Sequence, residues 1–210
     1  MIKKHLKTLI LTTVITLLPI LAGLILWNRL PERMPFHWNA AGEVDGWAGR
    51  PVAVFVGPVL MAAIEWICVL VTGADPKQKD QSGKVMGLVL WLIPVLSILV
   101  SFMMYSAAMG MEIRVEKIMP VFLGLLFVVI GNYLPKCKQS YTVGIKIPWT
   151  LNSEENWFRT HRMAGRLWTV CGLAMMVTAF LGGFWVFMVI TLVMVLVPVL
   201  YSWVLYRRGI

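Results

Sequence analysis

Long apolar blocks separated by short polar ones dominate the chain, and this pattern predicts membrane-spanning helices. Four blocks are nearly free of charge, and each can cross a hydrocarbon core, which takes about 17 to 25 helical residues; they are 8–27, 51–72, 85–111 and 118–134. The last block, 167–206, is uncharged and about twice as long as one span needs. Gly182-Gly183 stands where a turn is needed, so this block predicts two helices and the chain six.

Composition agrees with this pattern and sets the class. Hydrophobic residues make up 59% of the chain and charged residues 14%, and the mean hydropathy is +0.79. Such values are typical of a polytopic membrane protein. We therefore expect an all-α, six-helix transmembrane bundle. The first apolar run is longer than the h-region of a secretory signal and no cleavage site with a soluble domain follows it, which predicts an uncleaved first span.

The expected organisation is a single membrane domain over 1–210. Its first two spans lie within 1–72 and enclose an outer loop at 28–50, and a polar segment at 131–165 leads into the fifth span. Below, 131–165 is called the signature segment.

Lysine and arginine near the helix ends predict the orientation. With a cytoplasmic amino terminus, fourteen of these residues fall on the inside and five on the outside. This excess predicts that both termini and the signature segment are cytoplasmic. A basic cytoplasmic face is attracted to anionic lipid headgroups, which explains the net charge of +9 without nucleic acid. We therefore expect no direct binding of nucleic acid.

The outer loop carries prolines and aromatic residues. Pro31 and Pro35 favour extended backbone before them, so we expect a compact, non-helical cap. Its aromatic residues suit headgroup depth, where they would anchor the loop, although the loop also offers the largest recognition surface on its side. A third reading is a divalent-metal site, since imidazole and carboxylate are competent ligands; it would use His37, Glu43 and Asp45. We expect no metal, because one His with two irregularly spaced acids is a weak pattern.

The signature segment divides near Trp149. Upstream, Pro135, Gly144 and Pro148 break any helix, and the alternation in YTVGIKI predicts a short strand or an extended strip. Downstream, Asn152 with Glu155 three residues later predicts a helix start in which Asn152 is the N-cap.

That helix should carry two distinct faces. Trp157, His161, Gly165 and Trp168 fall on one face, and Phe158, Arg162 and Arg166 on a neighbouring one. The two faces fit either a helix anchored at the membrane interface or a docking surface for a cytoplasmic partner. Small residues at 165, 169 and 172 would let another helix approach closely.

Glu65 and the three cysteines lead to two smaller expectations. Glu65 lies deep in the second span, so it must face the bundle interior, either as a protonated hydrogen-bonding group or in proton or cation handling. Cys68, Cys137 and Cys171 form no metal-binding spacing and are expected to be apolar fillers. The sequence offers no convergent catalytic constellation, so we expect no enzyme, no catalytic residue and no cofactor.

Two motifs carry a resemblance to a known family. The signature segment, with GIKIPWTL at 144–151 and W-x-x-x-H-R at 157–162, resembles the SdpI-type bacterial membrane proteins. The outer loop, with its Pro, His-x-Asn and Gly-x-x-Asp-Gly pattern, resembles the uncharacterised domain that commonly precedes that signature. The chain departs from the family pattern at Ser140, where Asn is usual, and at Lys146-Ile147, where Arg-Thr is usual. Lys146 keeps the charge but lacks the planar fork of a guanidinium.

The resemblance implies immunity to a secreted, membrane-active peptide toxin and, in some relatives, signalling that holds a cytoplasmic repressor at the membrane. The implied partner-binding residues of the signature segment are Asn132, Pro135, Tyr141, Gly144, Lys146, Pro148, Trp149, Thr150, Trp157, Thr160, His161, Arg162 and Gly165. The implied recognition residues of the outer loop are Pro35, His37, Trp38, Asn39, Gly42 and Asp45. The bacterial cell membrane is the expected location. The alternative function is a small proton- or ion-coupled transporter or channel that uses Glu65.

Overall fold

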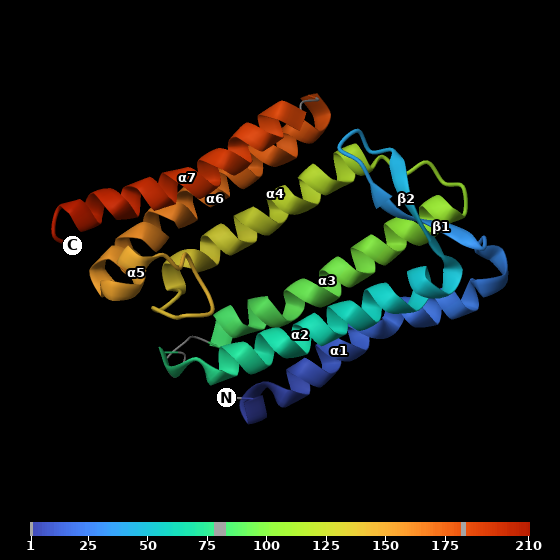
Figure 1. Cartoon of the computed structure of the whole chain (residues 1–210), viewed down its shortest axis with the longest axis horizontal. Helices are drawn as coiled ribbons and strands as arrows, with labels where there is room; N and C mark the ends of the chain where they lie inside the picture. Colours follow the sequence, from blue (N-terminus) through green and yellow to red (C-terminus); the bar gives the residue numbers. More distant parts are fainter. Residues whose placement is uncertain (1, 78–82, 182–183) are drawn as a thin grey trace. The chain divides into compact units, whose positions relative to one another are not determined.

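The structure is a computed structural model that describes residues 2–77, 83–181 and 184–210. Helices account for most of them (Figure 1). The long helices are α1 (Ile2–Ile25), α2 (Gly57–Ala74), α3 (Gly83–Ala108), α4 (Val115–Tyr133), α6 (Glu154–Leu181) and α7 (Phe184–Arg207). The short helical segments are η1 (Trp27–Arg29), the π-helical η2 (Val52–Val56), η4 (Leu134–Lys136) and α5 (Pro148–Asn152).

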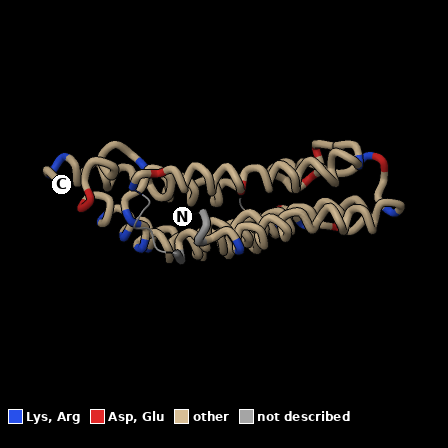
Figure 2. The backbone as a smooth tube through the Cα atoms, turned by 90° about the horizontal axis from the view of Figure 1, so that it is seen from below, with Lys and Arg blue, Asp and Glu red and all other residues tan. Residues whose placement is uncertain are grey.

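Among the described residues, six helices are long and apolar enough to cross a membrane, which confirms the predicted number of spans. They cover His5–Ile25, Val52–Ala74, Val85–Ala108, Val115–Lys136, Glu154–Leu181 and Phe184–Arg207. Charged residues lie mainly near the ends of these helices, as Figure 2 shows. The all-α membrane fold is confirmed, whereas the sidedness of the termini stays a prediction. The predicted turn at Gly182-Gly183 lies outside the described residues.

The chain falls into two compact units, which are described separately. The first comprises Met1–Gly73 and Met86–Val115 and therefore contains α1, α2, most of α3 and the outer loop. One part of its core joins the three helices through Leu9, Val69 and Leu90. Another part packs Leu30 and Met34 of the outer loop against Val54 and Tyr105. The outer loop is therefore seated on the helix ends of this unit.

The outer loop is a β-hairpin, which was not predicted. Strand β1 (Arg33–Trp38) pairs antiparallel with β2 (Val44–Gly49), and the register shifts on both sides of His37. The hairpin is non-helical, as expected for the cap, whereas the prediction is wrong at Trp27–Arg29, which form a 3-10 turn. Arg50 fastens the base of the hairpin, since its guanidinium donates to the carbonyl oxygens of Trp27 and Leu30 at 2.7 and 3.1 Å.

The second unit comprises Ala74–Val85 and Glu116–Ile210. Helix α6 packs against α7, where the Trp168 indole donates to the Met194 carbonyl at 3.0 Å. It also packs closely against α4, because a Cβ atom on Gly165 would lie 2.6 Å from the Gly131 carbonyl oxygen. A Cβ on Gly172 would likewise lie 2.5 Å from the Gly124 carbonyl oxygen. The predicted close approach through small residues is thus confirmed, with α4 as the neighbour.

Local structure in the signature segment differs from the prediction in three ways. Residues 141–147 follow an irregular path with bends and form no strand. Pro148 begins the short helix α5 instead of breaking one, because its missing N–H costs nothing in a first turn. The N-cap of α6 is Ser153 and not Asn152, since the Ser153 hydroxyl accepts a 3.2 Å hydrogen bond from the Asn156 N–H.

Candidate functional site

The signature segment is organised around the carboxylate of Asp75, which follows directly after α2. Its Oδ2 atom accepts hydrogen bonds from the Ser140 hydroxyl at 2.7 Å, the Tyr141 N–H at 2.8 Å and both the N–H and the hydroxyl of Thr142 at 3.1 and 3.0 Å. The other oxygen, Oδ1, accepts from the Lys77 N–H at 2.9 Å. Asp75 is buried, so these bonds satisfy a charge that would otherwise be costly.

The same contacts decide the charge state of Asp75. Burial acts to raise the pKa of this carboxyl, but the hydrogen bonds from Ser140, Lys77, Thr142 and Tyr141 outweigh it and lower the pKa below the usual 3.8. Asp75 is therefore a carboxylate at neutral pH. It holds the start of the irregular strip by charge-assisted hydrogen bonds, which are stronger than neutral ones.

Lys77 and Gln139 bind the strip to α5. The Lys77 ammonium donates to Gln139 Oε1 at 2.8 Å and to the Leu151 carbonyl at 3.3 Å, and it lies 5.0 Å from the centroid of the Tyr141 ring. The Gln139 amide donates to the carbonyls of Thr150 and Leu151 at 2.8 and 3.0 Å. These bonds satisfy carbonyls at the end of a helix too short to satisfy them itself.

Trp157 and His161, one turn apart on α6, form a stacked platform beneath the strip. Their rings are 3.9 Å apart at 20°, and both residues are buried. The Trp157 indole donates to the Cys137 carbonyl at 2.8 Å. Gly144 lies against the platform with a φ of +122°, and a Cβ atom there would lie 2.6 Å from His161 Nε2. Only glycine therefore fits this position without strain.

Hydrogen bonding defines the state of the His161 ring. Its Nδ1 atom lies 2.8 Å from the Trp157 carbonyl oxygen, which can only accept, so Nδ1 carries the hydrogen. Its Nε2 atom accepts the Ile145 N–H at 2.9 Å. The ring is thus neutral, with both nitrogens used inside the protein. His161 positions the strip, and no free nitrogen remains to act on a substrate.

Burial divides the predicted partner-binding residues into three groups. Thr150, Trp157, Thr160, His161 and Gly165 are buried and shape the segment. Tyr141, Lys146, Pro148, Asn132 and Arg162 are exposed, whereas Pro135, Gly144 and Trp149 are half-buried. Tyr141, Lys146 and Pro148 follow one another along the strip and the start of α5, and their side chains are exposed.

Several residues of this network were not anticipated from the sequence. Asp75, Gln139 and Asn156 are the main ones. The Asn156 amide donates to the Ser202 carbonyl at 3.0 Å, while its oxygen accepts the Ser202 hydroxyl at 2.6 Å, which ties α6 to α7. An acidic residue directly after a span was the available signal for Asp75, because such a carboxylate needs donors close by.

Cys137 behaves as the predicted filler. Burial raises the pKa of its thiol to about 11, so it stays protonated and unreactive at neutral pH. All three cysteines are free thiols.

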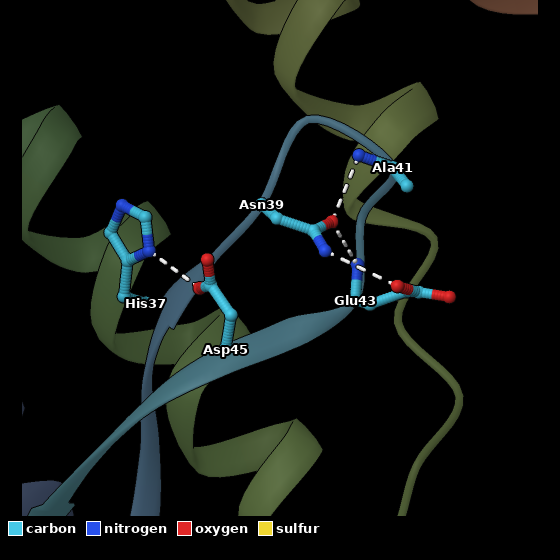
Figure 3. A network of polar contacts seen from close by, with 5 residues as sticks. All are labelled: His37, Asn39, Ala41, Glu43 and Asp45. Atoms are coloured by element: carbon cyan, nitrogen blue, oxygen red, sulfur yellow. Dashed lines mark hydrogen bonds and ion pairs between the residues drawn. The ribbon is translucent and has the colours of Figure 1, made fainter.

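The hairpin gives structural roles to His37, Asn39, Gly42 and Asp45 of the outer-loop motif, and Figure 3 shows the contacts of His37, Asn39 and Asp45. His37 Nδ1 pairs with Asp45 Oδ1 across the two strands at 2.6 Å. The Asn39 side-chain oxygen accepts the N–H groups of Ala41 and Glu43 at 2.9 and 3.0 Å and so closes the turn. Gly42 has a φ of +82° in this turn. Pro35 is buried and Trp38 half-buried, whereas His37 and Asp45 are exposed.

The geometry of this loop does not support the hypothesis of a divalent-metal site. Glu43 turns to the Asn39 amide at 3.2 Å while His37 pairs with Asp45, so the three side chains do not converge. Among the described residues there is no group of three His, Cys, Asp or Glu side chains that could hold a metal ion.

Glu65 is buried within the first unit and faces α1. Its Oε2 atom lies 3.2 Å from the Thr16 hydroxyl and 3.5 Å from the Thr13 hydroxyl. Its Oε1 atom is buried with no hydrogen-bond partner among the described residues. The expectation that Glu65 faces the bundle interior is therefore met, with hydroxyl groups as its neighbours.

These features define an α-helical multi-pass membrane protein with a rigid hairpin and a tightly bonded signature segment. Residues 136–202 match the model of the SdpI/YfhL protein family, and residues 14–62 match a domain of unknown function, DUF1648. The chain is 24% identical over 199 residues to "Immunity protein SdpI" of Bacillus subtilis (strain 168), covering 92% of each chain. No solved structure matches it. These matches confirm the resemblance to SdpI-type proteins and to the domain that precedes their signature, and the protein is a multi-pass bacterial membrane protein.

Proposed function

We propose that this protein is an immunity protein that protects the bacterial cell against a secreted, membrane-active peptide. The observation that carries the proposal is the similarity to an immunity protein along 92% of both chains, which includes the hairpin and the signature segment. Similarity confined to the spans would support only a shared membrane fold.

The hairpin is the proposed recognition surface for the peptide. Phe36 and Trp47 are 44% and 57% exposed, and the His37–Asp45 pair is exposed beside them. Paired strands, the Asn39 turn and Arg50 hold the hairpin in one shape, so little conformational entropy would be lost on binding. Exposed aromatic rings on a rigid support are favourable anchors for an amphipathic peptide.

The signature segment is proposed to present Tyr141, Lys146 and Pro148 to a cytoplasmic partner, such as a repressor protein held at the membrane. Support comes from the buried network below these residues, in which Asp75, Thr150 and His161 fix the strip. A polar network so extensively bonded specifies one surface shape, which a binding partner requires.

Survival of a toxin-sensitive bacterium tests the immunity proposal and its recognition surface together. Cells expressing the wild-type chain should survive doses from a panel of membrane-active peptides that kill vector cells. Trp47→Ala should weaken protection, whereas Trp185→Ala, which removes an aromatic ring that is 78% exposed on α7, should not. Equal protection by the two variants, at equal amounts in the membrane, would show that the hairpin is not the recognition surface.

Capture of partners from native membranes tests the signature segment. Tyr141→Ala and Trp149→Ala should reduce the amount of a captured cytoplasmic protein, and Asn152→Ala, on an exposed side chain of the same segment, should leave it unchanged. If no cytoplasmic protein is captured by the wild-type chain, the signalling part of the proposal is wrong while the immunity part stands.

A second candidate is a proton- or ion-coupled transporter, which is favoured by the buried Oε1 atom of Glu65, since it has no hydrogen-bond partner in the described part of the chain. This function predicts a flux in liposomes that Glu65→Gln abolishes and that Glu116→Gln, at the exposed start of α4, preserves. The immunity function predicts no such flux and allows Glu65→Gln to protect cells normally.

A further inference from the structure

A groove of about 720 Å³ runs along the first half of α6, with Tyr201 of α7 on its other wall. Its α6 residues lie between Glu155 and Val170 and follow the spacing of a single helix face. The hairpin, the Asp75 network and Glu65 contribute nothing to it. The groove is therefore a separate feature of the second unit.

The charged residues of the groove lie toward one end of it, and beyond Arg166 its α6 residues are apolar. At the amino-terminal end of the groove, Arg159 forms an ion pair with Glu155, which neutralises both. One turn further on, Arg162 and Arg166 are exposed and have no ion-pair or hydrogen-bond partner among the described residues. Beyond them the groove continues over Leu167 and Val170, and Val170 is 65% exposed.

The position of these residues along α6 places the groove at the membrane boundary. Helix α6 has 28 residues, more than the roughly 20 that cross a hydrocarbon core. Its charged turns end at Arg166, and the following residues up to Leu181 are uncharged. Arg162 and Arg166 therefore lie at headgroup depth, while Leu167 and Val170 lie at the depth of acyl chains.

We propose that this groove binds an anionic phospholipid. The guanidinium groups of Arg162 and Arg166, four residues apart on one face, would share the lipid phosphate. The apolar surface of Met163, Leu167 and Val170 would receive an acyl chain. Two unpaired guanidinium groups above an apolar wall complement a lipid that combines an anionic phosphate with a hydrocarbon chain, and a water-soluble anion would leave that wall uncovered.

Lipid retention by the purified full chain tests the proposal. The protein is purified in neutral detergent, mixed with equal amounts of phosphatidylglycerol and phosphatidylcholine, and examined by native mass spectrometry. The wild-type chain should retain phosphatidylglycerol in preference. The Arg162→Gln, Arg166→Gln double variant should retain it about tenfold less or lower, because each lost charge-assisted contact is a substantial part of the binding energy.

A matched variant controls for charge alone. Arg207→Gln, Arg208→Gln removes two exposed arginines at the end of α7, outside the groove, and should retain phosphatidylglycerol as the wild type does. An Arg162→Lys, Arg166→Lys variant keeps the charge and should show intermediate retention, which keeps the test valid if the glutamine variant fails to fold.

Three results would overturn the proposal. One is equal retention by the wild type and the Arg162→Gln, Arg166→Gln variant. Another is an equal loss in the Arg207→Gln, Arg208→Gln control, which would indicate non-specific charge attraction. The third is full displacement of the lipid by glycerol phosphate at comparable concentration, which would show that the site recognises a soluble anion. The proposal is independent of the immunity function, since the test contains no toxin and no partner protein.

Discussion

The Ser140 hydroxyl donates a 2.7 Å hydrogen bond to the carboxylate of Asp75, which lies 65 positions earlier in the chain. This bond joins the polar segment after the second span to the signature segment after the fourth. An even number of spans separates the two segments, so the six-span topology places them on the same side of the membrane. Ser140 therefore helps to fix the shape of the signature segment.

Ser140→Ala should destabilise the second unit by about 1 to 3 kcal/mol, because it removes a donor from a buried carboxylate. The change is measured as the free energy of unfolding in detergent, together with the rate of proteolysis within residues 137–147. Asn152→Ala removes an exposed polar side chain from the same segment and should cost less than about 0.5 kcal/mol. Equal effects of the two variants would contradict the role given to Ser140.

Acid should loosen the signature segment only below the usual range of carboxyl titration. The pKa of Asp75 is lowered from 3.8, so its stabilising effect is complete above that value and is lost as the pH falls through the lower folded pKa. Pepsin cleavage within residues 137–147, followed from pH 6 to pH 2, measures this loss. Asp75→Asn should remove the acid-dependent step; a step of the same size in both proteins would exclude Asp75 as its source.

Gly144→Ala should be far more damaging than Gly110→Ala. Both glycines have a positive φ, of +122° and +83°, so each variant bears a backbone cost of about 1 to 3 kcal/mol. Only at Gly144 would the added Cβ also meet His161 and Trp157, at 2.6 and 2.7 Å, whereas nothing lies within 4 Å at Gly110. The difference between the two unfolding free energies measures the platform contact together with the more strained φ at Gly144, and equal values would show that the contact is not sustained.

The close approach of α4 and α6 predicts a similar contrast between two helical glycines. Gly165→Ala places a Cβ atom 2.6 Å from the Gly131 carbonyl oxygen and should cost about 1 to 3 kcal/mol through overpacking. Gly87→Ala in α3 meets nothing within 4 Å and should be neutral or slightly stabilising, since alanine favours helix. Thermal unfolding in detergent compares them, and a stable Gly165→Ala protein would contradict the packing.

Much of the fold was predictable because the membrane imposes simple rules on sequence. Blocks of sufficient length with little or no charge predicted the six spans found among the described residues, since backbone polar groups in lipid must bond within a helix. Helical periodicity placed Trp157 and His161 on one face and Phe158 and Arg162 on a neighbouring one, and the structure buries the first pair and exposes the second. Local pattern was sufficient wherever one helix face alone determined the environment.

The remaining features depend on contacts between distant positions. The bond between Asp75 and Ser140 leaves no periodic pattern, because it joins two short irregular segments. The pairing of His37 with Asp45 depends on the register of two short strands, which shifts on both sides of His37. Ser153 replaced Asn152 as N-cap because α5 occupies Pro148–Asn152, so α6 can begin only after it. Asn and Ser are both favourable N-cap residues, so the end of α5 determined which of the two caps α6.

The dose of toxic peptide that halves the survival of a sensitive bacterium is the most direct measure of the proposed immunity function. Cells carrying the wild-type chain should need a higher dose than vector cells for at least one peptide of a panel, and Gly144→Ala should lose more of this protection than Gly110→Ala. Identical doses for wild-type and vector cells across the whole panel, with the protein verified in the membrane, would contradict the account.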